Sequence, residues 1–121
     1  MKIKRNLINF NDGLALESGA KLDSFELMVE TYGELNNEKS NGILICHAFS
    51  GNHHAAGILE DSEEPGWWDN IIGPGKAVDT DKYFVICSNV ISGCLGSFGP
   101  SNTNNETNKV YVTTFPVITI N

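Results

Sequence analysis

The chain has 121 residues, a formal net charge of −7 and a hydrophobic fraction of 40%. This length suits one modest domain, and the scattered basic residues argue against nucleic-acid binding, because phosphate contacts need clustered Lys and Arg. No apolar run reaches the roughly 20 residues that cross a bilayer, and no apolar core follows the basic start. We therefore expect neither membrane insertion nor a signal peptide, and a cytoplasmic location.

The first third of the chain is predicted to form antiparallel strands at the edge of a sheet. Residues 1–10 alternate loosely between apolar and polar positions, which indicates a frayed first strand or an extended arm, and Asn11–Gly13 is a turn signal. Leu14–Glu17 is strand-like, and Phe25–Tyr32 alternates with a period of two, which is typical of a strand with one solvated face. Gly33–Asn41 is polar and turn-rich and is predicted to be a surface loop.

Two short apolar runs, Ile43–Cys46 and Tyr83–Val90, predict strands that are buried on both faces of a sheet. Between them, Trp67–Ile72 is predicted to form a short helix, whose two Trp side chains are expected to pack rather than to contact substrate. The acidic run at 60–64 is predicted to be a solvated surface and not a metal site. Residues 93–108 are predicted to form a long loop.

The loop after the first apolar run is the candidate site. In open α/β sheets, ligands bind beyond the carboxyl ends of such strands, and small residues let backbone N–H groups approach a ligand closely. Three histidines, His47, His53 and His54, fall within eight positions. A metal site would need further ligands, so we expect no metal. For His47 and His53 a pocket-wall role and a purely structural role both remain open.

Cysteine thiols and serine hydroxyls are the possible nucleophiles of this chain. Three cysteines are too few and too unevenly spaced for a disulfide framework. Cys46 and Cys87 lie in apolar runs and are expected to be buried, whereas Cys94 in a Gly-rich loop lacks an evident polarising partner. Neither Ser50 nor Ser97 has the two glycines of a G-x-S-x-G elbow, so no nucleophile is predicted within this chain.

Three stretches carry a resemblance to a known family. They are G-I-L-I-C-H-A-F-S-G-N-H-H-A-A-G at Gly42–Gly57, P-G-W-W-D-N-I-I-G-P-G-K-A-V-D-T-D-K-Y-F-V-I-C-S-N-V at Pro65–Val90, and G-C-L-G-S-F-G-P-S at Gly93–Ser101. With them the chain resembles the homoserine O-acetyltransferases, α/β-hydrolase-fold acyltransferases of methionine biosynthesis. The resemblance runs from about Phe25 to the end and departs from the family pattern at Asn102–Val112, where a Pro and a Gly are missing.

The resemblance implies an α/β class fold, namely the N-terminal part of an α/β-hydrolase domain. We expect antiparallel edge strands followed by parallel core strands in an incomplete sheet, with residues 1–121 as one fragment of a single domain. The resemblance also implies an oxyanion-hole N–H in the loop at 47–51, assigned to Phe49 with Ala48 as the alternative. A competing interpretation makes Phe49 a core residue. Further pocket candidates are His47, Ser50, Gly51, Asn52 and His53.

For the function, the resemblance implies a truncated homoserine O-acyltransferase. The whole enzyme would move an acetyl or succinyl group from acyl-CoA, its co-substrate, to homoserine through an acyl-serine intermediate, with no other cofactor and as a homodimer. Acceptors such as serine are a close variant. Because the triad residues are not found, we expect the chain alone to be inactive. Because half a sheet leaves an apolar strand edge unpaired, we also expect it to be marginally stable. The alternatives are a non-catalytic remnant or half-module that pairs with a separate C-terminal chain, and an independent hydrolase.

Overall fold

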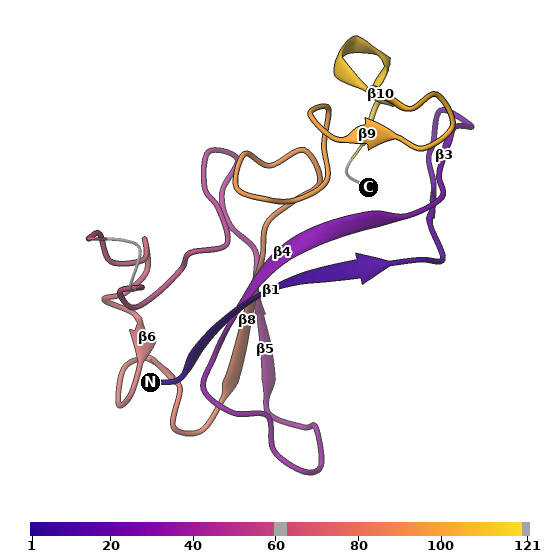
Figure 1. Ribbon diagram of the computed structural model, residues 1–121. Helices are drawn as coiled ribbons and strands as arrows, with labels where there is room; N and C mark the ends of the chain where they lie inside the picture. Colours follow the sequence, from indigo (N-terminus) through magenta and orange to yellow (C-terminus); the bar gives the residue numbers. More distant parts are fainter. Residues whose placement is uncertain (60–62, 120–121) are drawn as a thin grey trace.

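The computed structural model describes residues 1–59 and 63–119. Its centre is a four-stranded sheet in the order β1 (Ile3–Phe10), β4 (Phe25–Tyr32), β8 (Phe84–Ser88) and β5 (Gly42–Ile45) (Figure 1). The β1–β4 and β4–β8 pairs are antiparallel, whereas β5 and β8 are parallel. This mixed sheet confirms the expected antiparallel edge strands followed by a parallel pair.

Strands β1 and β4 form the longest ladder of the molecule. Their register runs from Ile3 opposite Tyr32 to Phe10 opposite Phe25, and the two Phe rings stack with centroids 4.9 Å apart. Beyond that end, β2 (Leu14–Ala15) pairs with β3 (Lys21–Leu22). The predicted antiparallel arrangement is confirmed, although the strand expected at 14–17 is only two residues long.

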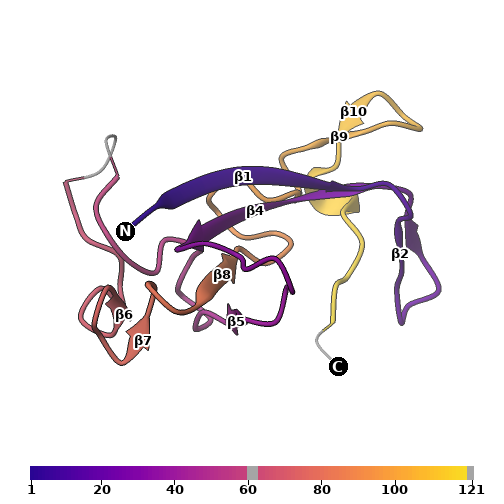
Figure 2. The ribbon, with the colours of Figure 1, turned by 90° about the horizontal axis from the view of Figure 1, so that it is seen from below.

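The remaining elements are short and lie at the two ends of the sheet. Strand β6 (Ile72–Gly73) pairs in parallel with β7 (Val78–Asp79), and β9 (Thr103–Asn104) pairs with β10 (Lys109–Val110). A 3₁₀ turn, η1 (Val112–Thr114), follows β10. Figure 2 shows β6 and β7 at one end and the β9–β10 hairpin at the other. The prediction that residues 93–108 form only a loop is therefore wrong in part, because β9 lies within this range.

The helix predicted at Trp67–Ile72 is wrong. The Asp69 N–H donates to the Gly66 carbonyl at 3.0 Å, and the Ile71 N–H donates to the Trp68 carbonyl at 2.9 Å, which are turn contacts. Ile72 then enters the parallel bridge to β7 and is fully buried. A single hydrogen-bonded turn does not repay the cost of helix nucleation, so pairing and burial of Ile72 determine the local structure.

Burial on β5 also differs from the prediction. Ile43 and Ile45 pack against the core, but Leu44 is 65% exposed and Cys46 is exposed. The expectation of a strand buried on both faces, and of a buried Cys46, is therefore wrong. The reason is that side chains alternate between the faces of a strand, so Leu44 and Cys46 lie on the face opposite Ile43 and Ile45, which the described residues leave open. The prediction that Cys87 is buried is confirmed.

The solvated face predicted for Phe25–Tyr32 is wrong as well. Glu30 and Tyr32 are both fully buried, because the segment at 53–56 packs over their face of β4. The core centred there consists of six fully buried residues: Tyr32, Ala55, Ala56, Ile72, Val85 and Cys87. A fully buried carboxylate is thus built into the edge of an apolar cluster.

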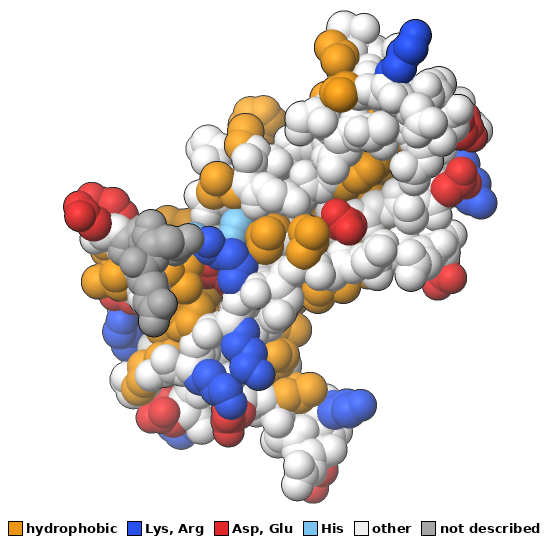
Figure 3. Space-filling view, viewed as in Figure 1, with side chains coloured by type: hydrophobic (Ala, Val, Ile, Leu, Met, Phe, Trp, Pro, Cys, Tyr) orange, Lys and Arg blue, Asp and Glu red, His pale blue; other side chains and the backbone are white. Residues whose placement is uncertain are grey.

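Apolar side chains also remain open to solvent, and some of them appear in orange on the face shown in Figure 3. The most exposed include Leu44, Phe49, Ile58 and Val117. Within the described ranges no helix has the length and apolarity to cross a membrane. The acidic run predicted to be solvated falls outside the described residues at 60–62, as does the end of the chain at 120–121.

Candidate functional site

The candidate site is the loop at 47–57, which leaves the carboxyl end of β5. Its first part is a tight turn, in which the Gly51 N–H donates to the Ala48 carbonyl at 2.8 Å. Phe49 lies within this turn with its side chain fully exposed, so the interpretation of Phe49 as a core residue is wrong. Within residues 1–59 and 63–119 the Phe49 N–H has no hydrogen-bond acceptor. The turn therefore presents an uncommitted backbone donor.

The other pocket candidates divide into exposed and buried residues. Ser50 is exposed beside Phe49, whereas His53 is only 2% exposed. His47 is half-buried, and its Nδ1 lies 2.7 Å from the Ala48 carbonyl, while its buried Nε2 has no partner in the described structure. Ser50 therefore faces solvent on the turn, whereas His53 lies in the core and does not share that surface.

Asn52 is committed to structural contacts. Its Oδ1 accepts from the His54 N–H at 2.8 Å, and its carbonyl accepts from Trp67 Nε1–H at 2.9 Å. Trp67 and Trp68 lie in a tilted pair with centroids 5.1 Å apart, and each is roughly two-fifths exposed. Asn52 thus joins the loop after β5 to the Trp turn, in a packing role.

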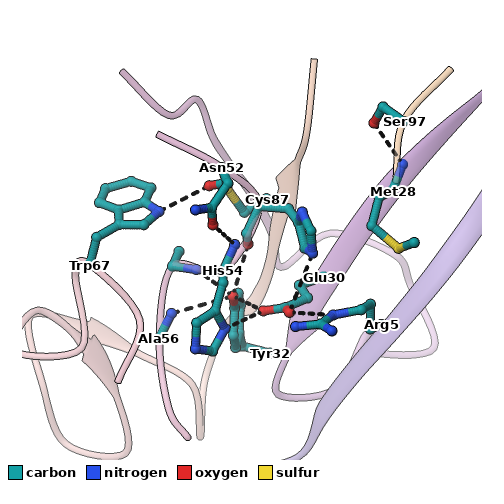
Figure 4. A network of polar contacts seen from close by, with 12 residues as sticks. Arg5, Met28, Glu30, Tyr32, Asn52, His54, Ala56, Trp67, Cys87 and Ser97 are labelled. Carbon is teal, nitrogen blue, oxygen red and sulfur yellow. Dashed lines mark hydrogen bonds and ion pairs between the residues drawn. The ribbon is translucent and has the colours of Figure 1, made fainter. Parts of the chain in front are cut away.

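A buried polar network centred on Glu30 holds the second part of the loop (Figure 4). Arg5 Nε on β1 donates to Glu30 Oε1 at 2.9 Å, and His54 Nδ1 lies 3.0 Å from Glu30 Oε2. His53 Nε2 lies 3.7 Å from Glu30 Oε1. Residues from β1, β4 and the loop therefore meet at a single carboxylate.

The hydroxyl of Tyr32 is the second centre of this network. It donates to Glu30 Oε2 at 2.6 Å, and it accepts from the N–H groups of Ala55 at 2.8 Å and Ala56 at 3.3 Å. The His53 carbonyl lies 3.1 Å from the same hydroxyl. One side chain on β4 thus satisfies two buried backbone donors of the loop.

Burial shifts the proton affinities of this region. It raises the pKa of Tyr32, and the hydrogen bond to Glu30 raises it further. Burial also raises the pKa of the Cys87 thiol to about 11, with smaller contributions from the charges of Glu30 and Cys46. The pKa of His53 is lowered by burial, although the nearby Glu30 charge opposes that shift. Each of these groups is therefore held in its neutral form near neutral pH.

Neither candidate serine is placed as a nucleophile. The hydroxyl of Ser97 accepts from the Met28 N–H at 3.0 Å and donates to the Asn89 carbonyl at 3.1 Å, and Ser97 is 8% exposed. In the part of the chain that the structure describes, no hydrogen bond joins Ser50 or Ser97 to a histidine. In the same ranges, no group of three His, Cys, Asp or Glu residues could hold a metal ion.

Sequence reasoning located the loop but missed the network. The sequence pattern assigns Glu30 and Tyr32 only to a strand and indicates no role for Arg5. Arg5 and Glu30 are 25 residues apart in the sequence and meet only because β1 pairs with β4. The available signal was the spacing of two between Glu30 and Tyr32, which puts both side chains on one face of the strand.

Comparison with solved structures defines the class. Homoserine O-acetyltransferase from Bacillus anthracis superposes with a TM-score of 0.87 and 41% identity, over 98% of this chain and 34% of that one. Esterase E22 superposes with a TM-score of 0.86 and 38% identity, over the same shares of the two chains. No family model matches the sequence. The chain therefore has part of an α/β-hydrolase fold.

Comparison of sequences gives the family. The chain is 62% identical over 107 residues to a homoserine O-acetyltransferase of Methanosphaerula palustris, covering 88% of this chain and 22% of the relative. It is 56% identical over 115 residues to a homoserine O-succinyltransferase of Saccharophagus degradans, covering 94% and 30% respectively. The chain belongs to the homoserine O-acyltransferase family and matches its N-terminal portion. It spans less than a third of the length of these relatives.

Proposed function

We propose that residues 1–121 form one part of a single catalytic domain of a homoserine O-acyltransferase. The whole protein transfers an acetyl or succinyl group from acyl-CoA to the hydroxyl of homoserine. The observation that carries this proposal is the turn at 48–51, which follows a parallel strand and presents a Phe49 N–H that has no acceptor among the described residues. The names of the relatives support both the acceptor and the acyl donor.

The chemistry requires such a donor. A serine hydroxyl attacks the thioester carbonyl, the carbonyl oxygen becomes an oxyanion, and coenzyme A leaves as the thiol. The homoserine hydroxyl then attacks the acyl-serine ester and releases the serine. In both steps, N–H groups aimed at the oxyanion stabilise the tetrahedral intermediate. We assign one of these donors to Phe49, with Ala48 as the alternative.

The proposal also expects this chain alone to be inactive. In the described residues the hydroxyl of Ser97 is engaged in backbone contacts, and the outer edge of β5 has no pairing strand. The nucleophile would therefore come from protein outside this sequence that pairs with β5. We further expect the whole protein to be a cytoplasmic homodimer, as suits a biosynthetic enzyme that uses acyl-CoA.

A chimeric enzyme tests the function. This chain replaces the matching segment of the Methanosphaerula palustris enzyme, to which it is 62% identical. The purified chimera is assayed for acyl-homoserine with acetyl-CoA and, separately, with succinyl-CoA. We expect acyl transfer from one of the two donors, and no transfer by the 121-residue chain alone. A folded chimera that transfers from neither donor would contradict the proposal.

A substitution that removes one backbone N–H tests the oxyanion assignment. Phe49→Pro in the chimera deletes the donor, and we expect kcat to fall by about 10²–10³. Phe49→Leu changes the side chain but keeps the N–H, so it is the matched control and should stay near the parent rate. Should Ala48→Pro reproduce the loss while Phe49→Pro does not, the donor is Ala48.

The open edge of β5 supports a second candidate, a half-module that pairs with a separately encoded chain. Leu44 on this strand is 65% exposed, which is unusual for an apolar residue next to a core. Mixing the 121-residue chain with the separately produced remainder of the relative tests it. Recovery of acyl transfer in a stoichiometric complex would favour the half-module over a continuous enzyme.

A further inference from the structure

We propose that Glu30 and Tyr32 form a latch that positions the oxyanion turn at 48–51. Neither residue touches the turn itself, so both are positioning residues that act through the segment at 53–56. The inference rests on the proposed function for the role of the turn. The latch itself is a structural statement about this chain.

The loop at 47–57 is attached to the sheet at two places. Its beginning is continuous with β5, and its far part is bound through the Tyr32 hydroxyl, which accepts from the N–H groups of Ala55 and Ala56. Both alanines are fully buried, so these N–H groups have no access to water. Loss of the hydroxyl would leave the Ala56 N–H without its acceptor and the Ala55 N–H with only the His53 carbonyl at 3.0 Å. A folded chain avoids an unpaired buried donor by moving the segment.

Glu30 fixes the direction of the Tyr32 hydroxyl. A tyrosine hydroxyl has one hydrogen to donate and also accepts hydrogen bonds. Glu30 Oε2 takes the hydrogen at 2.6 Å, which turns the acceptor side of the oxygen toward Ala55 and Ala56. Without an acceptor at that place, the hydroxyl could instead donate to the His53 carbonyl at 3.1 Å. The carboxylate therefore selects one of two arrangements.

Glu30 also ties the loop to β1. Its carboxylate is fully buried and receives Arg5 Nε at 2.9 Å and His54 Nδ1 at 3.0 Å. A buried charge is tolerated only when such partners compensate it. Because the carboxylate accepts, His54 must carry a hydrogen on Nδ1. Arg5, Glu30 and His54 thus connect the edge strand, the centre of the sheet and the loop.

Only a short piece of chain separates the latch from the proposed donor. Asn52 Oδ1 accepts from the His54 N–H at 2.8 Å, so Asn52 moves with the latched segment. Ser50 and Gly51 alone lie between Asn52 and Phe49, and the turn is closed by the bond from the Gly51 N–H to the Ala48 carbonyl. A displacement of the segment at 53–56 should therefore also displace the Phe49 N–H, because only Ser50 and Gly51 separate Phe49 from Asn52.

Amide hydrogen exchange of the 121-residue chain tests the latch. Tyr32→Phe and Glu30→Gln keep the side-chain shapes, and Glu26→Gln is the matched control on the same strand. We expect peptides covering residues 47–57 to exchange at least about tenfold faster in both latch variants. Peptides from β4 and β8 should gain clearly less, because they follow only the loss of global stability. Unchanged exchange at 47–57, or an equal increase throughout the sheet, would overturn the proposal.

A spectroscopic measurement on the unmodified chain needs no variant. We expect ¹⁵N NMR of the imidazoles to show a hydrogen on Nδ1 of His54, and a His54 that is protonated on Nε2 alone would overturn the latch.

In the active chimera, Glu30→Gln should lower kcat at unchanged KM for homoserine, whereas Glu26→Gln should change neither. A chimera that is inactive with the native sequence refutes the proposed function and leaves the exchange and NMR outcomes to decide the latch. Fast local exchange at 47–57 with an unchanged kcat would refute the positioning role.

Discussion

The hydroxyl of Tyr32 donates a 2.6 Å hydrogen bond to the carboxylate of Glu30, two residues earlier on β4, and both side chains are fully buried. Side chains two apart on a strand share one face, so this pair forms a polar centre beneath the segment at 53–56. The apolar residues around it, including Val85 and Cys87, shield the hydrogen bond from water. The strength of such a bond depends on every partner being present.

Replacing Tyr32 by Phe should destabilise the fold. The ring keeps its packing, but the Ala56 N–H loses its acceptor, the Ala55 N–H keeps only the His53 carbonyl at 3.0 Å, and Glu30 loses a donor. Leaving buried donors unpaired costs about 1–3 kcal/mol. Urea unfolding followed by circular dichroism should show a lower midpoint with an unchanged m-value.

Tyr83→Phe serves as the control for this change. Tyr83 is 41% exposed, and its hydroxyl makes no hydrogen bond within residues 1–59 and 63–119. The same atom is removed at a solvated position, so we expect a change in the free energy of unfolding within about 0.5 kcal/mol. Equal losses for both variants would show that the Tyr32 hydroxyl has no special role.

Acidification should weaken the fold through His53. The pKa of this imidazole is lowered from its ordinary value of 6.5 by burial, against an opposing contribution from Glu30, while Arg5, His54 and His47 lower it further. The unfolded chain takes up a proton near pH 6.5 and the folded chain resists it, so the unfolded state binds more protons. The contribution of His53 to the free energy of unfolding should therefore be fully present above pH 6.5 and should decline as the pH falls below that value.

The carboxylates of Asp69 and Asp79 should affect the stability of the fold at lower pH than His53 does. Their pKa values lie below the ordinary 3.8, chiefly because backbone N–H groups of Gly57 and Gly75 donate to them. Their contribution is present above about pH 4 and is lost below it. Thermal melts between pH 7 and pH 3 should show two stages, and His53→Asn should remove the first. A single decline below pH 4 in the unmodified chain would contradict this assignment.

The strands were predictable because their signals are local. The alternation in Phe25–Tyr32 and the apolar runs before His47 and Asn89 each specify a strand without reference to distant residues. The position of the candidate loop followed from the strand that it leaves. These features need only a short stretch of sequence and the general geometry of sheets.

What was missed depends on contacts between distant residues. Glu30 is buried because the segment at 53–56 covers it, and no local pattern reveals that cover. Leu44 is exposed because its face of β5, opposite Ile43 and Ile45, is left uncovered by the described residues, which depends on how distant segments pack on the sheet. The apolar run at 67–72 fits a helix equally well until pairing of Ile72 with Val78 decides otherwise.

The three cysteines should differ sharply in reactivity. Cys87 is buried and its thiol pKa is raised to about 11, whereas Cys46 and Cys94 are exposed. Alkylation requires the thiolate and access to it. With iodoacetamide at pH 8, mass spectrometry should find rapid modification of Cys46 and Cys94 in the native chain, and of Cys87 only after addition of urea. Modification of all three at one rate would show that β8 is not in the core.

The exposed edge of β5 should govern self-association of the chain. An unpaired apolar strand edge invites pairing with other chains, and a charged side chain suppresses such pairing. Leu44→Lys places a charge on β5, where the native side chain is 65% exposed, so the cost to the isolated fold should be small. Sedimentation velocity should show fewer oligomers for Leu44→Lys than for the parent chain.

Val110→Lys adds the same charge on the β9–β10 hairpin, where the native side chain is 49% exposed, and it should leave the sedimentation profile unchanged. In the chimera the same Leu44→Lys change should be harmful, because there the rest of the catalytic domain is proposed to pack on β5 and cover this side chain. The charge would then be buried at the new contact and would reduce the yield of active enzyme. A fully active Leu44→Lys chimera would mean that the outer face of β5 stays open in the whole protein, and that the missing part of the catalytic domain joins elsewhere.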